Sequence, residues 1–448
     1  MVYQQEYQRK RVSAEEAVKV VKSGDIVDYG FFNGKPTVCD IALANRKDEL
    51  QDVQVFCAVT IPPVPEVAKL RGNFIYMDWQ FSKVARVLQS NYELCYYSPI
   101  LYHQAPNLYR DAIAPHRNVA ISRVCPMDKW GYFNLGPQNS ETMANMEVAD
   151  YVIVEVNKNM PVCLGGAEES VHISQVDYIV EAPDDDVLMD VPGAEPTEVD
   201  KQIANHVMKF IQDGSCIQLG IGGMPNAVGK AIAASDLKNL GGHTEMFVDA
   251  YVDMIESGRM NGSVKNIDRH RVGYTFAIGS QRMYDFMNMN PGLASYPVDY
   301  TNDPRVIQRL DNFVSINNAV EVDLYSQVNA ESNDTTQISG NGGMWDFVLG
   351  AQWSQNGKSF ICLSSTFTDS EGRMQSRIVP TFAPASITTI PRQMVDYIVT
   401  EYGAVGLRAK PTWQRAEELI SIAHPDFRDE LIKQAAKLKL WRRTNKIE

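Results

Sequence analysis

Apolar and polar positions alternate along the chain in short blocks that predict strands and helices in turn. Within residues 213–249, the apolar run Cys216–Leu219 predicts a strand, and the glycines that follow it predict a turn. A helix is expected from about Pro225, because proline suits the first helical turn. The apolar run Met246–Val248 predicts the next strand. This order is a βαβ unit, in which ligands lie beyond the carboxyl ends of the strands.

The same order of elements occurs near the start of the chain. Ser13 and Glu16 form a capping box ahead of a predicted helix that ends at about residue 23, and residues 25–29 predict a strand. A further strand is expected in each copy, at Val53–Thr60 and at Thr244–Val248. The repeat predicts two similar α/β domains. Its landmarks recur in step to within one residue: Gly24, Gly30 and Pro36, then Gly214, Gly220 and Pro225.

Other apolar runs predict strands separated by helical patterns, which is typical of a parallel sheet. An acidic, proline-rich stretch without periodicity divides the two copies and predicts a linker. We therefore expect an N-terminal α/β domain at 1–182, a linker at 183–198 and a C-terminal α/β domain at 199–448. The further predicted strands are 118–124, 151–156, 177–181, 271–277, 312–316, 319–324, 360–363 and 397–400, and the further helices are 140–148, 199–211 and 426–441.

Composition excludes several classes of protein. The formal net charge of −13 and the pI near 5.1 argue against nucleic acid or an anionic membrane as the main partner. No apolar run is long enough to span a membrane, and the polar N-terminus lacks the core of a signal peptide. We expect a cytoplasmic protein that forms a homo-oligomer.

Cysteine and histidine spacing indicates no metal site. The seven cysteines include no CxxC pair, and the seven histidines show neither HxH nor HExxH spacing. We expect reduced, buried thiols and no bound metal.

Two glycine motifs and two glutamates are the candidates for chemistry. Gly220, Gly222 and Gly223 open a helix, and Gly340, Gly342 and Gly343 precede a helical pattern. Adjacent glycines allow backbone N–H groups to converge on an anion, although an ordinary tight turn explains each motif equally well. Glu245 and Glu331 compete for the role of nucleophile or general base.

Several motifs resemble the family I coenzyme A-transferases of the butyryl-CoA:acetate and 4-hydroxybutyrate CoA-transferase group, along nearly the whole chain. The stretches that carry the resemblance are 122–136, 155–161, 172–181, 219–228, His243-Thr-Glu245-Met, 297–302, 340–343 and 422–427.

The resemblance implies two similar open α/β domains with the active site between them and a nucleophile at Glu245. Glu245 would attack the acyl-CoA thioester, and the released CoA would then form a covalent glutamyl-CoA intermediate. It further implies oxyanion donors at Asn302 and at Gly342 or Gly343, and a CoA side formed by Gly220, Gly222 and Gly223, with no tightly bound cofactor.

By resemblance, the substrates are butyryl-CoA and acetate. A 4-hydroxybutyrate or other short-chain acyl-CoA transferase is one alternative, and an acyl-CoA hydrolase is an alternative of another class. The chain departs from the family pattern at Trp345, which we expect to narrow or reshape the acyl pocket, and at residues 30–36, which would face the acyl group.

Overall fold

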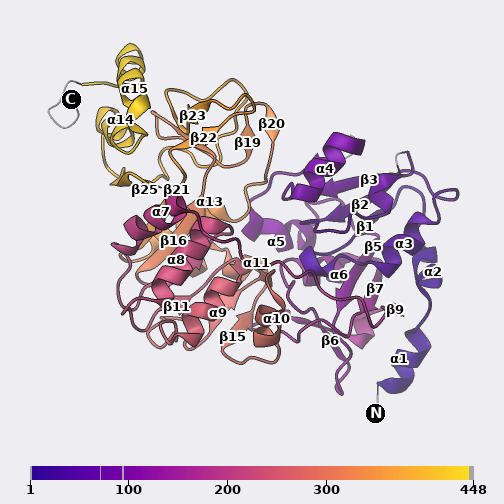
Figure 1. Ribbon diagram of the computed structural model, residues 1–448. Helices are drawn as coiled ribbons and strands as arrows, with labels where there is room; N and C mark the ends of the chain where they lie inside the picture. Colours follow the sequence, from indigo (N-terminus) through magenta and orange to yellow (C-terminus); the bar gives the residue numbers. More distant parts are fainter. Residues whose placement is uncertain (1–2, 71, 93–94, 443–448) are drawn as a thin grey trace.

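The computed structural model describes residues 3–70, 72–92 and 95–442, arranged as two halves that lie side by side (Figure 1). Each half is built around one main sheet with helices packed on it. The mixed α/β architecture predicted from the sequence is confirmed.

The first sheet has seven strands in the order β4-β3-β2-β1-β5-β7-β9, and all neighbours are parallel. Both faces of β5 are buried: Val119 and Ile121 face one apolar cluster, and Ala120 and Val124 face another. A sheet buried on both faces needs strands that are apolar at successive positions, and such continuous apolar runs can be predicted as strands from the sequence. The strands are β1 Ile26–Asp28, β2 Val53–Cys57, β3 Phe74–Asp78, β4 Cys95–Tyr97, β5 Val119–Val124, β7 Tyr151–Val156 and β9 Tyr178–Glu181.

The second sheet has six strands in the order β11-β10-β16-β21-β25-β26, parallel except for the last pair. Three helices pack side by side on one face, and α13 lies on the other (Figure 1). The strands are β10 Cys216–Leu219, β11 Gly241–Gly242, β16 Phe313–Asn318, β21 Lys358–Cys362, β25 Tyr397–Thr400 and β26 Gly403–Gly406.

Five neighbouring strands follow the same order in both sheets. Strands β2-β1-β5-β7-β9 of the first sheet match β11-β10-β16-β21-β25 of the second. The counterpart of β2 is therefore Gly241–Gly242, and the prediction that Thr244–Val248 plays this part was wrong. Two glycines carry no apolar signal, yet they are required here, because a β-carbon on Gly241 would lie 2.6 Å from the side chain of Lys265.

The remaining elements are short strands and the helices. The strands are β6 Tyr132–Asn134, β8 Ser170–His172, β12 Met246–Phe247, β13 Val272–Tyr274, β14 Phe276–Ala277, β15 Leu293–Ser295, β17 Glu321–Asp323, β18 Val328–Asn329, β19 Ser332–Asn333, β20 Thr336–Gln337, β22 Thr366–Thr368, β23 Met374–Ser376 and β24 Ile378–Val379. The α-helices are α1 Gln4–Lys10, α2 Ala14–Ala17, α3 Val38–Ala44, α4 Lys83–Tyr92, α5 Ala105–Arg110, α6 Thr142–Val148, α7 Glu198–Met208, α8 Gly223–Ala233, α9 Asp249–Glu256, α10 Gln281–Met287, α11 Val298–Thr301, α12 Pro304–Ile307, α13 Met344–Trp353, α14 Thr412–Ser421 and α15 Pro425–Lys437. The 3₁₀ helices are η1 Val18–Val20, η2 Phe32–Gly34, η3 Val67–Lys69, η4 Tyr102–Gln104 and η5 Ile173–Gln175.

Two predicted elements differ in the structure. The helix expected to end near residue 23 is a single α-helical turn, α2, followed by the 3₁₀ turn η1. The strand expected at 271–277 breaks at Thr275, so that β13 pairs with β15 and β14 pairs with β12. The break lets the Thr275 amide donate to the carbonyl of Glu245 at 3.0 Å.

Residues 183–197 of the predicted linker form no helix or strand, but they pack on the second half of the chain. Leu188 is buried in the main cluster of that half, and the Val191 amide donates to the carbonyl of Gly279 at 2.9 Å. The domain boundaries themselves stay a prediction.

The cysteines are buried as expected, within the described side chains. Six are buried without a disulfide, and the side chain of Cys95 lies outside what the structure describes. The six are Cys39, Cys57, Cys125, Cys163, Cys216 and Cys362.

Candidate active site

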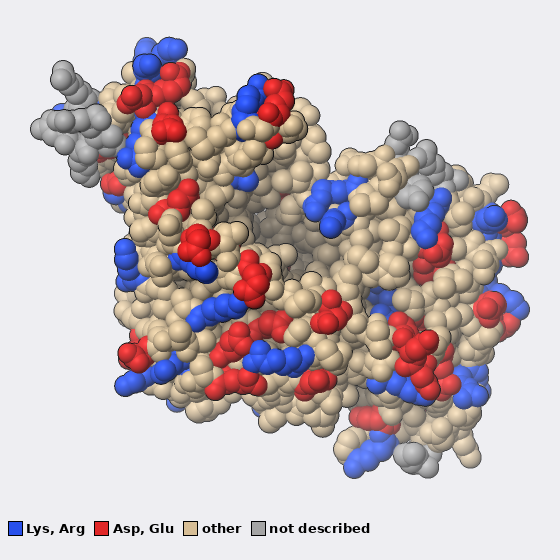
Figure 2. Space-filling model, viewed as in Figure 1, with Lys and Arg blue, Asp and Glu red and all other residues tan. Residues whose placement is uncertain are grey.

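The carboxyl ends of the two main sheets face each other across a cavity of about 720 Å³. Residues after β1, β2 and β3 line one side, and the carboxyl-terminal residues of β10 and β16 line the other. Figure 2 shows the hollow between the halves, with basic side chains gathered over α4 at its edge. Ligands of parallel α/β sheets bind at such ends, where the strand order reverses. In the second sheet this point lies between β10 and β16.

The backbone of Glu245 is fixed from the strands beside it. The amides of Thr275 and Phe276 both donate to its carbonyl, at 3.0 and 3.3 Å, and the Thr244 amide donates to Gly273 at 2.9 Å. The half-buried Glu245 side chain therefore points into the cavity from a rigid support.

Two of the predicted site residues lie against the Glu245 carboxylate. The amide nitrogen Nδ2 of the buried Asn302 donates to Oε2 of Glu245 at 2.7 Å. Gly343 lies so close that a β-carbon there would stand 2.1 Å from the same oxygen. The structure thus brings Glu245, Asn302 and Gly343 together at one end of the cavity.

Burial is the main cause that raises the pKa of Glu245 to about 7. Hydrogen bonds from Asn302 and from the Gly343 amide oppose the increase, and the nearby charge of Asp346 adds to it. A carboxylate near its pKa at neutral pH can act either as a nucleophile or as a proton acceptor.

The glycine loop at 340–343 is held by the other half of the molecule. The amide of Gly340 donates to the backbone carbonyl of Gln80, and the amide of Gly342 donates to its side-chain oxygen at 2.8 Å. Gln80 follows β3, an element that the sequence analysis did not predict. The site is therefore assembled only when the two halves are in contact.

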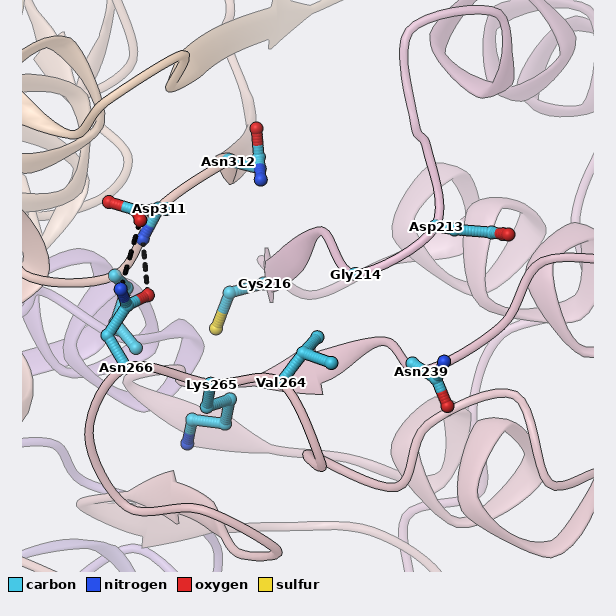
Figure 3. Close-up of a pocket in the computed structure, with 10 residues that line it drawn as sticks. Asp213, Gly214, Cys216, Asn239, Val264, Lys265, Asn266, Asp311 and Asn312 are labelled. Carbon is cyan, nitrogen blue, oxygen red and sulfur yellow. Dashed lines mark hydrogen bonds between the residues drawn. The ribbon is translucent and has the colours of Figure 1, made fainter.

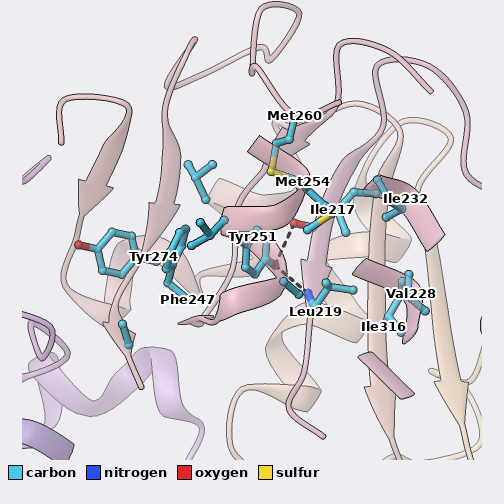
Figure 4. Packing of buried hydrophobic residues seen from close by; sticks show 14 of the residues in the cluster. Ile217, Leu219, Val228, Ile232, Phe247, Tyr251, Met254, Met260, Tyr274 and Ile316 are labelled. Carbon is cyan, nitrogen blue, oxygen red and sulfur yellow. Dashed lines mark hydrogen bonds between the residues drawn. The ribbon is translucent and has the colours of Figure 1, made fainter. Parts of the chain in front are cut away.

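The first glycine motif contributes in part. Gly220 lines the cavity, whereas Gly223 lines an adjoining groove of about 1210 Å³, and Gly222 is the cap of α8, with φ of +113°. Helix α8 begins at Gly223, two residues earlier than expected. Tyr251 of α9 supports the strand before this turn, because its hydroxyl accepts from the Leu219 amide at 2.9 Å (Figure 4).

Glu331 lies elsewhere. Its carboxylate accepts from the hydroxyls of Tyr97 at 3.1 Å and Thr389 at 2.8 Å. Glu331 is not among the described residues that line the cavity. These contacts are typical of a structural carboxylate, so the geometry favours Glu245 as the reacting group.

The prediction that Trp345 narrows or reshapes the acyl pocket was wrong. Its side chain packs on the apolar cluster of the C-terminal region, whereas Met344 and Phe347 line the cavity. Residues three apart share one helix face, and the next residue along points away. Phe31 and Phe32, within the segment expected to face the acyl group, do line the cavity.

A smaller pocket of about 340 Å³ lies at the opposite, amino ends of β10 and β16 (Figure 3). Burial raises the pKa of Cys216 in this pocket to about 11, so its thiol is protonated at neutral pH. Lys265 is buried beside it and donates to the carbonyls of Gly242 at 2.9 Å and Arg271 at 2.7 Å. Lys265 thus anchors the backbone three residues before Glu245.

Sequence reasoning missed Gln80, Tyr102 and His103. Tyr102 lines the cavity, and His103 binds Asp346 behind it. Gln80 lies in an irregular segment after β3, and Tyr102 and His103 lie in the short 3₁₀ helix η4, so no spacing rule could have found them.

Two kinds of feature are not found among the described residues. No three His, Cys, Asp or Glu side chains gather as a metal site requires. Nor does any described helix combine the length and apolar character needed to cross a membrane.

Comparison with known proteins supplies the family. The Acetyl-CoA hydrolase/transferase N-terminal domain matches residues 1–190, and the C-terminal domain of the same name matches residues 279–435. The chain is 51% identical to the butyryl-CoA:acetate CoA-transferase of Anaerostipes caccae, covering 100% of both chains. It is 49% identical to the probable butyrate:acetyl-CoA coenzyme A-transferase of Syntrophomonas wolfei, covering 99% of this chain and 98% of that one.

A solved structure agrees with these matches. The crystal structure of 4-hydroxybutyrate CoA-transferase from Porphyromonas gingivalis superposes with a TM-score of 0.80 at 33% identity, covering 97% of this chain and 100% of that chain. The resemblance predicted from the sequence is confirmed. The chain belongs to the acetyl-CoA hydrolase/transferase family and is a CoA-transferase.

Proposed function

We propose that the protein transfers coenzyme A from butyryl-CoA to acetate through a covalent glutamyl-CoA thioester on Glu245. The observation that carries the proposal is the contact of Asn302 Nδ2 with Oε2 of Glu245 at 2.7 Å, at one end of a cavity between the two sheets. Oligomerisation and a cytoplasmic location stay predictions.

The reaction would proceed by two exchanges at carboxyl carbons. An oxygen of Glu245 attacks the thioester carbonyl, the carbon–sulfur bond breaks, and CoA leaves as the thiolate, so that the butyryl group stays on Glu245 as a mixed anhydride. The thiolate then attacks the glutamyl carbon and releases butyrate. Acetate reverses both steps and leaves as acetyl-CoA. Asn302 and the Gly343 amide are placed to stabilise the oxyanions, since donors fixed beforehand need no reorganisation in the transition state.

The walls around Glu245 favour a short apolar acyl group. Phe31, Phe32 and Phe276 form an aromatic cluster with ring centroids 4.5 to 5.0 Å apart, and all three line the cavity. Among the described lining residues, the charged side chains other than Glu245 are Lys83 and Arg86, both on α4. An acyl group with a second carboxylate would find no cation on the aromatic wall, and this favours butyryl over succinyl.

The adjoining groove fits the remainder of CoA. Asn318 lines both the cavity and the groove, so a chain-like pantetheine arm could pass from one to the other. Arg377 lines the groove, with its guanidinium 4.9 Å from the ring centre of Phe367. Guanidinium groups suit phosphates, so we place the nucleotide of CoA there.

The decisive test is mass spectrometry of the protein after incubation with butyryl-CoA. A CoA adduct on the peptide that contains Glu245 would support the proposal, provided that borohydride reduces its thioester at Glu245. The Glu245→Ala variant should lose both the adduct and transfer, whereas Glu331→Ala should keep them. Loss of transfer in Glu331→Ala with retention in Glu245→Ala would overturn the assignment.

The same incubation separates transfer from hydrolysis. Steady release of free CoA without acetate would indicate an acyl-CoA hydrolase, because water rather than a carboxylate would resolve the intermediate. Strict dependence on acetate would support the transferase. Faster turnover of 4-hydroxybutyryl-CoA than of butyryl-CoA would contradict the proposed acyl preference.

A further inference from the structure

A pair of the half-buried His103 and the fully buried Asp346 joins the two halves of the molecule behind Glu245. His103 belongs to η4 of the first half, and Asp346 belongs to α13 of the second. Nδ1 of His103 lies 2.7 Å from Oδ1 of Asp346, and the His103 amide donates to Oδ2 at 3.1 Å. The Asp346 side chain is 1% exposed, and a carboxylate so buried needs such partners.

The pair continues into the site through Asn302. Asp346 accepts a hydrogen bond from the Asn302 side chain, whose Nδ2 also donates to Glu245 at 2.7 Å. On the other side of the amide, the Thr301 hydroxyl donates to Oδ1 of Asn302 at 3.0 Å. An ionised carboxylate can only accept, so Asp346 keeps the nitrogen of the amide turned toward Glu245.

We propose that His103 is a positioning residue for CoA transfer: it holds and neutralises Asp346, and Asp346 in turn fixes the amide of Asn302 against Glu245. This inference rests on the proposed role of Glu245 as the nucleophile. His103 does not itself touch the reacting atoms.

Electrostatics gives the pair a second consequence. The charge of Asp346 raises the pKa of Glu245, so an unneutralised Asp346 would keep more of Glu245 protonated and inactive at neutral pH. A protonated His103 offsets this charge. Burial lowers the pKa of His103, but the hydrogen bond and charge of Asp346, with the charge of Asp303, outweigh burial and the opposing Arg305, and the pKa is raised.

A pair that only joined the two halves would affect stability and leave the titration of Glu245 unchanged. The test therefore measures kcat/KM for butyryl-CoA against pH in two variants. His103→Asn keeps a donor near the place of Nδ1 but removes the positive charge. Asp346→Asn removes the negative charge at nearly constant volume.

The two variants should move the acid limb of the profile in opposite directions. We expect the midpoint of the acid limb to shift to higher pH by about 0.5 to 1 unit in His103→Asn and to shift to lower pH in Asp346→Asn. His116→Asn is the matched control, because His116 forms an exposed pair with Asp150, 3.0 Å apart, and should leave the limb unmoved.

Other outcomes would overturn the inference. Profiles of both variants that superpose on that of the wild type, or that move in the same direction, would leave His103 a structural residue. If one variant does not fold, as judged by thermal unfolding, the direction of the other still decides. Transfer that survives in Glu245→Ala would instead refute the proposed nucleophile, so the two failures are distinguishable.

Discussion

Gly343 packs against Glu245 so tightly that any side chain at this position would collide with the carboxylate: a β-carbon would stand 2.1 Å from Oε2 of Glu245 and 2.2 Å from Nδ2 of Asn302. Glycine is required here by space rather than by backbone conformation, because Gly343 caps α13 with φ of −90°, which any residue can adopt.

The Gly343→Ala variant should therefore lose activity far more than stability. The methyl group would displace the Asn302 amide or the Gly343 backbone, and loss of one oxyanion donor costs about 10² to 10³ in kcat. Steady-state kinetics with butyryl-CoA and acetate would measure this. Gly292→Ala is the matched control, since its new β-carbon would meet only Oδ1 of Asn290, at 3.2 Å, where a shift of a few tenths of an ångström suffices. Equal activity in both variants would contradict the role of Gly343.

The rate should depend on pH through the ionisation of Glu245. The nucleophile must be deprotonated, and burial raises its pKa to about 7. We expect kcat/KM for butyryl-CoA to rise with pH and to level off above about 7, since this parameter reports groups of the free enzyme. A profile that is flat between about pH 5 and pH 8 would show that Glu245 ionises well below this value.

Phe32 should limit the length of the acyl chain. It lines the cavity in contact with Phe276, with ring centroids 4.7 Å apart. Phe32→Ala would open space for about two further methylene groups, and one methylene in an apolar pocket changes kcat/KM by about 10-fold or more. We expect the ratio of kcat/KM for hexanoyl-CoA to that for butyryl-CoA to rise by about 10-fold. The ratio carries its own control, because a general loss of activity cancels. An unchanged ratio would place the acyl chain elsewhere.

Long apolar runs made most of the fold predictable, and their absence explains what was missed. The strands Tyr151–Val156, Cys216–Leu219 and Tyr397–Thr400 lie where the sequence predicted them, because each is a largely buried apolar strand of a main sheet. Gly241–Gly242 has no apolar side chain to mark it as a strand. The break at Thr275 depends on tertiary hydrogen bonds to Glu245, which local patterning does not encode.

Only those residues of the candidate site that belong to a recognisable sequence motif could be predicted. Glu245, Asn302 and the glycine loop came from the family resemblance. Gln80 and His103 became visible only when the two halves met, because their partners lie more than two hundred positions away along the chain.

The position of Glu245 should also cost stability above neutral pH. Its pKa is about 7 in the folded protein and near the model-compound value of 4.5 in the unfolded chain, so the folded state binds the extra proton between these values. Unfolding free energy therefore falls as pH rises through this window, and the cost is complete above about pH 7. The two values correspond to an upper limit of about 3 kcal/mol, and solvent in the cavity reduces it.

Glu245→Gln removes this titration. The unfolding free energy of the variant minus that of the wild type should grow between about pH 4.5 and pH 7 and then stay constant, as measured by urea denaturation. A Glu245→Gln difference that does not change with pH would mean that the carboxylate is as well solvated in the folded site as in the unfolded chain.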